Sequence, residues 1–342
     1  MGFKVVITDY EFATLEPEEK VLQQADVEFV KAQCKTEEEV IEACKDADGI
    51  INQYAPITRK VIENLDNCKV ISRYGVGVNT IDINAATEKG IIVGNVTDYC
   101  MDEVSDHAFS LLLACARKVT QLNNEVKAGN WDFKVGVPMY RLRGRTLGLV
   151  SFGKIPQTLA VKAQAFGIKT VAYDPFVDQE TAANLNTELV DLDELCRRSH
   201  FISVHAPLVE ATRGMMSDHQ FSLMKKEAFI INTARGPVID EKALARALEK
   251  GEIAGAGLDV VEEEPIPSDS PLLKMDQVIL NPHAAWYSEE AQQELKTKTA
   301  QNVAEVLNGK YPKYLVNQDV KEKAEVFVKQ INRKAGVGDG KK

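Results

Sequence analysis

The chain has 342 residues, enough for two domains of ordinary size. Its formal net charge is −10, from 41 basic and 51 acidic residues, and Lys and Arg cluster only in the short tail. This balance argues against direct binding to a nucleic-acid backbone or to an anionic membrane.

The first hundred residues alternate short apolar runs with charged helical segments. Residues 4–8, 49–52, 70–73 and 91–94 are apolar and β-branched and are predicted to be strands. Residues 36–45 are predicted to be a helix, because Thr36 and Glu39 suit a capping box. Such alternation is typical of a parallel sheet covered by helices.

One long helix is predicted over residues 102–127. Apolar residues recur there at three- and four-residue steps, and Gly129 suits a C-terminal stop. The apolar face is wide, so we expect a homodimer that forms through this helix and its neighbours.

A second alternating series follows. Its predicted strands are 146–150, 170–173, 201–205, 229–232, 254–259 and 278–280, and its helices include 157–166. The last predicted helix is 288–307, and the Gly- and Lys-rich end at about 330–342 is predicted to be disordered.

Six cysteines form no CxxC pair and match no zinc spacing, so we expect free thiols and no metal site. The chain start lacks a secretory apolar region, and the longest apolar stretch, 108–116, is too short to cross a membrane. A cytoplasmic protein without a membrane partner is the resulting expectation.

A glycine loop follows the strand 146–150. It matches the dinucleotide pattern G-x-G-x-x-G only at Gly153, because Ser151 and Pro156 replace the outer glycines. Context favours the pattern nonetheless: a strand precedes, a helix follows, and Asp174 lies 21 positions beyond Gly153.

Several residues of this region have the chemistry that dinucleotide binding needs. The backbone amides of Lys154 and Ile155 would meet a pyrophosphate at the helix N-terminus. Asp174 would bind ribose hydroxyls and repel a 2′-phosphate, which favours NAD over NADP. Two alternatives stay open: a mere strand-ending turn at Asp174, and a site that has lost NAD.

Polar segments follow the last three predicted strands. They read NTARG at 232–236, GLDVVEEEP at 257–265 and NPHAAW at 281–286. Residues just past the carboxyl ends of parallel strands face one crevice, so an arginine, an acid and a histidine are predicted to share it. Such a set can grip a 2-oxo or 2-hydroxy acid and move a proton at its second carbon. Taken singly, the arginine could be a surface ion-pair residue and the Pro-His pair a turn.

These segments resemble the D-isomer-specific 2-hydroxyacid dehydrogenases, from about Lys4 to about Pro312. The stretch HAAWYSE at 283–289 is most similar to the branch that contains the C-terminal-binding proteins. The resemblance implies an α/β protein of two doubly wound parallel-sheet domains. A flavodoxin-like substrate (catalytic) domain would comprise 1–100 and 288–342, and a Rossmann NAD-binding domain, 101–287, would be inserted in it.

The resemblance also implies an activity and partners. The expected activity is that of an NAD-dependent oxidoreductase acting on the CH-OH group of a small 2-hydroxy acid, or in reverse on the 2-oxo acid, in a homodimer. The alternative is an NAD-responsive, corepressor-like binding protein with weak or no dehydrogenase activity. Ser151 and Pro156 favour the alternative, and an intact catalytic set favours the enzyme.

Site residues follow from the same resemblance. The implied catalytic residues are Arg235, Glu264 and His283, with Glu264 selected over Glu262 and Glu263 by its place before a proline. The implied substrate-binding residues are Arg73, Val76, Gly77 and Trp286. The implied cofactor-binding residues are Gly153, Lys154, Ile155, Asp174, His205, Pro207, Thr233, Ala234 and Asp259. Trp286 could equally be a core residue, and Asp259 could cap a strand end.

Overall fold

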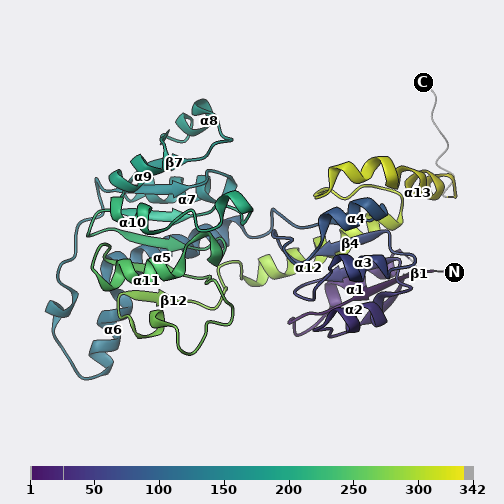
Figure 1. Ribbon diagram of the computed structural model, residues 1–342, viewed down its shortest axis with the longest axis horizontal. Helices are drawn as coiled ribbons and strands as arrows, with labels where there is room; N and C mark the ends of the chain where they lie inside the picture. Colours follow the sequence, from purple (N-terminus) through teal and green to yellow (C-terminus); the bar gives the residue numbers. More distant parts are fainter. Residues whose placement is uncertain (1, 26, 335–342) are drawn as a thin grey trace. The chain divides into compact units, whose positions relative to one another are not determined.

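The computed structural model describes residues 2–25 and 27–334, and the chain divides into two compact units (Figure 1). The first unit takes both chain ends, residues 1–99 and 288–342, and the second comprises Cys100–Tyr287. The chain therefore leaves the first unit once and returns to it once.

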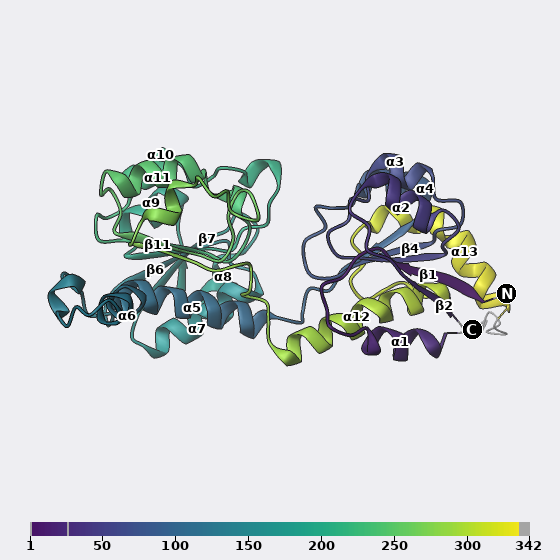
Figure 2. The same cartoon turned by 90° about the horizontal axis from the view of Figure 1, so that it is seen from below.

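The first unit is a parallel sheet with the flavodoxin-like strand order β2-β1-β3-β4-β5. The strands are β1 (Phe3–Ile7), β2 (Val27–Lys31), β3 (Gly49–Asn52), β4 (Val70–Arg73) and β5 (Ile92–Gly94). The helices are α1 (Glu16–Gln23), α2 (Glu37–Cys44), α3 (Arg59–Glu63), α4 (Ile83–Lys89), α12 (Glu289–Leu307) and α13 (Lys321–Lys334). Helices α1 and α12 cover one face and α2, α3 and α4 the other (Figure 2). The capping box of Thr36 and Glu39 is present as predicted.

The second unit is a parallel sheet with the order β12-β11-β10-β9-β6-β7-β8, which is a Rossmann arrangement with one further strand. The strands are β6 (Thr146–Val150), β7 (Lys169–Tyr173), β8 (Thr187–Leu189), β9 (Phe201–Val204), β10 (Phe229–Asn232), β11 (Gly255–Leu258) and β12 (Val278–Leu280). The helices are α5 (Met101–Arg117), α6 (Val119–Lys127), α7 (Lys154–Ala165), α8 (Gln179–Ala183), α9 (Leu192–Arg198), α10 (Asp218–Leu223) and α11 (Glu241–Glu249). Helices α5 and α7 cover one face and α9, α10 and α11 the other (Figure 2). The predicted fold class is confirmed.

Short 3-10 helices occur in the connections. They are η1 (Phe133–Gly136), η2 (Glu210–Thr212), η3 (Gly236–Val238), η4 (Pro271–Lys274) and η5 (Gln318–Val320).

Two strands, β2 and β8, were not predicted. Both lie at the edge of a sheet and are only partly buried. Polar residues therefore interrupt their apolar pattern, as Glu28 and Lys31 do in β2.

The prediction of one helix over 102–127 is wrong. Lys118 adopts a left-handed conformation, with φ of 51°, and separates α5 from α6. The apolar side of α5 is buried against β10, β11 and α7 in the same unit, as the exposed fractions of Leu111 (4%) and Leu112 (0%) show. The apolar face that suggested a dimer is thus part of the core of this unit.

The predicted disordered tail begins too early. Helix α13 continues to Lys334, because 321–334 contains no Gly or Pro and is rich in helix-forming residues. The rest of the predicted tail, 335–342, lies outside the described residues.

All six cysteines are buried thiols. Within residues 2–25 and 27–334, no helix has the length and apolar character needed to cross a bilayer.

Candidate active site

Three neighbouring strands of the second unit end at the same level. Asn232 pairs with Leu258 in the register of β10 and β11, and Leu258 pairs with Leu280 in that of β11 and β12. The segments that follow these residues therefore leave the sheet at one edge. They carry Arg235, Glu264 and His283, all within one unit.

His283 and Glu264 contact each other directly. The imidazole Nδ1 lies 2.7 Å from Oε2 of Glu264, and the two side chains are 40% and 39% exposed. Partial burial alone would raise the pKa of Glu264, but the hydrogen bond to His283 and the positive charges of His283 and Arg235 outweigh it and lower this pKa. Glu264 is therefore a carboxylate at neutral pH and can hold an imidazolium.

The neighbouring acid Glu262 has a different partner. Its Oε1 accepts the backbone N–H of Glu241 at 3.1 Å, and its own N–H donates to Oε2 of Glu241 at 3.0 Å. Glu262 thus serves the first turn of α11. Among the acids 262–264, Glu264 is the one whose carboxylate meets the imidazole.

A buried carboxylate shapes the turn that carries His283. The two oxygens of Asp259 accept the N–H groups of Ala284 and Ala285, each at 2.9 Å, and its carbonyl accepts the N–H of His283 at 2.8 Å. Asp259 is 1% exposed, and His283 has the left-handed φ of 54°. Asp259 therefore positions the histidine, a role that sequence reasoning missed. The predicted contact between Asp259 and the cofactor stays a prediction.

The turn that carries Arg235 is held by Asn232. Its amide donates to the carbonyl of Arg235 and accepts the N–H of Ala234, both at 3.0 Å. A Cβ at Gly236 would collide with the backbone of Val261, so only glycine lets this turn approach the Glu264 segment. The sequence carries an indication of this close turn, because a glycine, Gly236, directly follows Arg235.

The glycine loop joins β6 to α7. Ser151 has a φ of 75°, and Gly153 is the N-cap residue of α7. A Cβ at Gly153 would meet no atom within 4 Å, so the approach to the helix N-terminus is open there. Pro156 is the third residue of the helix, where the backbone N–H has no partner within a helix in any case. An open N-terminus of this kind fits the pyrophosphate of a dinucleotide.

Other predicted cofactor residues lie at the same sheet edge. His205 follows β9, its Nε2 is 2.8 Å from the hydroxyl of Ser203, and burial lowers its pKa to about 3, so the ring is neutral. Pro207 follows it and is exposed. Thr233 is 8% exposed, and its hydroxyl finds no hydrogen-bond partner within the described part of the chain, as fits a group that meets a ligand.

The predicted substrate-binding residues divide between the units. Arg73 ends β4, and its guanidinium lies where a side chain on Gly75 would be, so Gly75, with φ of 106°, allows this arrangement. Val76 is 41% exposed, and its carbonyl accepts the side-chain N–H of Asn95 at 2.6 Å. Gly77 is half-buried in the same loop. Trp286 belongs to the second unit and packs edge-to-face on Tyr287 at 5.6 Å.

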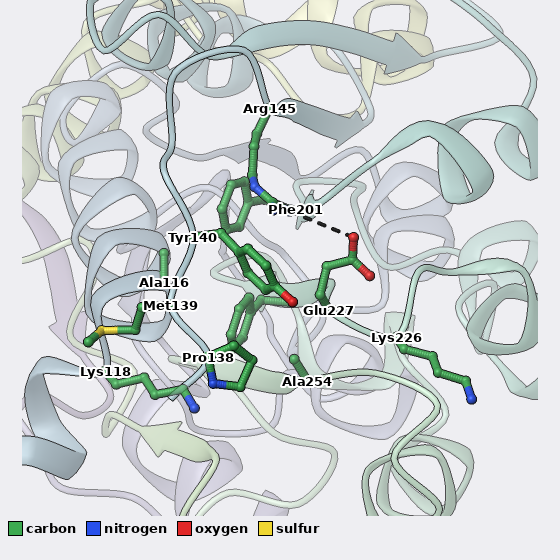
Figure 3. A pocket seen from close by; sticks show the side chains of 11 residues that line it. Ala116, Lys118, Pro138, Met139, Tyr140, Arg145, Phe201, Lys226, Glu227 and Ala254 are labelled. Carbon is green, nitrogen blue, oxygen red and sulfur yellow. Dashed lines mark ion pairs between the residues drawn. The ribbon is translucent and has the colours of Figure 1, made fainter. Parts of the chain in front are cut away.

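A pocket of about 400 Å³ lies in the second unit at the amino-terminal ends of β6, β9 and β10, away from His283 (Figure 3). The rings of Phe201 and Phe229 stack there at 6.2 Å. The guanidinium of Arg145 lies 4.4 Å from the ring centre of Tyr140 and 3.8 Å from the carboxylate of Glu227.

Comparisons with known proteins agree with this geometry. The family model described as "D-isomer specific 2-hydroxyacid dehydrogenase, NAD binding domain" matches residues 109–285. A D-3-phosphoglycerate dehydrogenase of Methanocaldococcus jannaschii is 45% identical over 286 residues, which cover 82% of this chain and 54% of that protein. The chain thus spans about half the length of that relative. A glyoxylate reductase of Korarchaeum cryptofilum is 40% identical over 285 residues, which cover 82% of this chain and 86% of that protein.

Solved structures show the same likeness. The holo form of D-mandelate dehydrogenase of Rhodotorula graminis has a TM-score of 0.85 and 30% identity, and the match covers 93% of this chain and 99% of that one. D-Lactate dehydrogenase of Aquifex aeolicus, complexed with NAD and lactic acid, has a TM-score of 0.81 and 28% identity over 89% of this chain and 96% of that one.

Proposed function

Because this chain belongs to the D-isomer-specific 2-hydroxyacid dehydrogenases, we propose that it reversibly reduces a 2-oxo acid with NADH. The observation that carries the proposal is the contact of His283 with Glu264 at 2.7 Å, at the sheet edge that also carries Arg235.

Each member of the trio has a task in this reaction. NADH, when bound, supplies a hydride to the second carbon of the acid. The oxygen on that carbon must gain a proton, and His283 donates it from Nε2, since Nδ1 is engaged by Glu264. Glu264 stabilises the charged imidazole, and the planar fork of Arg235 binds the substrate carboxylate.

The remaining predicted contacts belong to the same proposal. Arg73 and the backbone of Val76 and Gly77 would bind the substrate carboxylate, because glycine loops let amides approach an anion. Trp286 would contact the substrate side chain.

The NAD-binding domain offers contacts along the whole cofactor. The amides at the start of α7 would meet the pyrophosphate, and Asp174 the ribose hydroxyls. The neutral ring of His205 suits adenine. The proposed set is Gly153, Lys154, Ile155, Asp174, His205, Pro207, Thr233, Ala234 and Asp259.

The natural substrate is to be found by direct assay. NADH oxidation should be measured with glyoxylate, pyruvate, hydroxypyruvate and longer 2-oxo acids, and NAD reduction with D-3-phosphoglycerate, because relatives carry the names glyoxylate reductase and D-3-phosphoglycerate dehydrogenase. We expect turnover with at least one acid. Binding of NADH without turnover of any of them would contradict the proposal and would favour the corepressor-like alternative, which the relatives named above do not support.

We also propose a homodimer, with a changed interface. The segment 119–140 exposes several apolar side chains: Tyr140, which lines the pocket of Figure 3, is 46% exposed, and Trp131 is 90% exposed. A gathering of exposed apolar side chains typically marks an interaction surface. Its members are Val119, Val126, Trp131, Phe133, Val137 and Tyr140. The buried thiols are in keeping with the predicted cytoplasmic location.

A further inference from the structure

The glycine loop departs from its pattern in two places, and the two departures differ in kind. Pro156 only removes a backbone N–H that a helix start leaves unpaired. Ser151 adds a hydroxyl to the loop and places it in the left-handed region, which glycine occupies without penalty and serine does not.

The hydroxyl of Ser151 has a defined partner. It donates to Oδ2 of Asp174 at 3.1 Å, and the N–H of Phe152 donates to the same oxygen at 2.8 Å. The other oxygen, Oδ1, accepts the N–H of Phe176 at 2.8 Å. Three donors therefore hold the carboxylate of Asp174, the residue that follows β7.

A carboxylate oxygen accepts about two hydrogen bonds. The two donors from the glycine loop thus fill Oδ2, and Oδ1 keeps one position open beside the N–H of Phe176. The carboxylate of Asp174 is therefore oriented before any ligand binds, and its one remaining hydrogen-bond acceptor position is on Oδ1.

We propose that Ser151 is a positioning residue for the cofactor, whose hydroxyl holds Asp174 in the orientation that accepts the ribose of NAD and excludes a 2′-phosphate. This inference rests on the proposed use of NAD. Without the hydroxyl, only the N–H groups of Phe152 and Phe176 would hold the carboxylate, so Asp174 would be less firmly oriented and would exclude a 2′-phosphate less well. Ser151 therefore acts on cofactor choice through Asp174. The lost glycine is then a compensated substitution, in which a hydrogen bond to a charged group offsets the strained backbone.

The test is a double-mutant cycle on nucleotide binding. Dissociation constants for NADH and NADPH should be measured by fluorescence for the parent, Ser151→Ala, Asp174→Asn and the double variant. Ser151→Ala should weaken NADH binding by roughly threefold to tenfold, the range that the loss of one typical intramolecular hydrogen bond predicts for an effect transmitted through Asp174. It should also reduce the ratio of the NADPH dissociation constant to the NADH dissociation constant. In the Asp174→Asn background the same change should have little further effect.

Two further variants control the result. Thr158→Ala removes a hydroxyl from α7, the helix that follows the glycine loop, where it donates to the carbonyl of Lys154, and should leave both constants unchanged. Ser151→Gly removes the hydroxyl and the backbone strain together. Without nucleotide it should melt at a higher temperature than Ser151→Ala and still show the reduced ratio of dissociation constants.

Unchanged constants in Ser151→Ala, or an effect that adds fully to that of Asp174→Asn, would overturn the inference while leaving NAD binding intact. If the parent bound neither nucleotide, the use of NAD itself would be refuted instead.

Discussion

At the scale of single residues, one hydrogen bond determines which nitrogen of His283 remains for the substrate. Glu264 engages Nδ1 at 2.7 Å, so Nε2 is the nitrogen that can exchange a proton with an oxygen on the second carbon. The same bond keeps Glu264 ionised, because it outweighs the effect of partial burial on the pKa of this acid.

Replacing His283 should remove the proton donor. We expect His283→Ala to lower kcat by roughly 10²–10⁴-fold, the usual contribution of general acid–base catalysis. His283→Asn should lower kcat by a similar factor while keeping the left-handed backbone, which asparagine tolerates better than most residues. Steady-state kinetics and NADH fluorescence would check this, and the NADH dissociation constant should stay near that of the parent. Full activity in either variant would show that another group donates the proton.

Glu264→Gln should shift the pH profile in a defined direction. The carboxylate stabilises the imidazolium form of the ring, so its loss favours the neutral ring. Reduction needs the protonated ring and should therefore fade at lower pH than in the parent, whereas oxidation should persist to lower pH. Because the folded pKa of Glu264 is lowered, its contacts stabilise the fold above the ordinary carboxyl pKa and lose this effect as pH falls. Identical kcat profiles for parent and variant would contradict the assigned role.

At the scale of elements, turns after β10 and β12 are built by buried polar side chains rather than by the strands themselves. Asn232 fixes the turn of Arg235, and Asp259 fixes the turn of His283 through both carboxylate oxygens. A left-handed residue such as His283 persists because its surroundings hold it.

Asp259→Asn should loosen the turn of His283. One acceptor becomes an NH₂ group that faces a backbone N–H, so we expect a loss of about 1–3 kcal/mol in the free energy of unfolding and a fall in kcat. Asp240→Ala is the matched control, because Asp240 accepts the N–H of Ala243 at the start of α11 and does not hold the turn of His283. It should cost about 1 kcal/mol without changing kcat. Chemical denaturation and steady-state kinetics together separate the two effects, and a normal kcat in Asp259→Asn would refute the positioning role.

At the scale of the whole molecule, each unit has its own sheet and core, and the first is assembled from both ends of the chain. Helix α12 lies against β3 and β4 although some 200 residues separate them, and its Asn302 donates to Ser72 at 3.2 Å and to the carbonyl of Asn95 at 2.9 Å. In the second unit, α6 extends away from the sheet (Figure 2). Trp131, in the segment that follows α6, is exposed.

The dimer is tested on that segment. Trp131→Lys should convert a dimer into a monomer at micromolar concentration, since a charge at the centre of an apolar interface is costly to bury. Light scattering measures the change. Leu273→Lys, which alters an exposed apolar residue of η4, should leave the dimer intact. A parent protein that is already a monomer would refute the proposed assembly.

The sequence alone was enough to predict most strands and the order of the candidate catalytic residues. Central strands are buried on both faces and read as continuous apolar runs, so β3, β4, β6 and β10 were predicted with their observed bounds. The edge strand β12 is also a continuous apolar run and was predicted with its observed bounds. Each motif follows such a strand directly, so the edge at which Arg235, Glu264 and His283 emerge follows from local pattern and parallel pairing.

Only the tertiary structure showed the edge strands, the surface that buries α5 and the roles of two aspartates, because each depends on residues far away in the chain. The edge strands β2 and β8 form by pairing with a sheet, and polar residues interrupt their apolar pattern. Apolar residues of α5 predict burial but not the surface that buries them, and only packing on β10 and β11 shows that the surface is internal. The same holds for single side chains: Asp259 at the turn of His283 and Asp174 beside Ser151 acquire their roles when residues more than twenty positions apart are brought within hydrogen-bond distance.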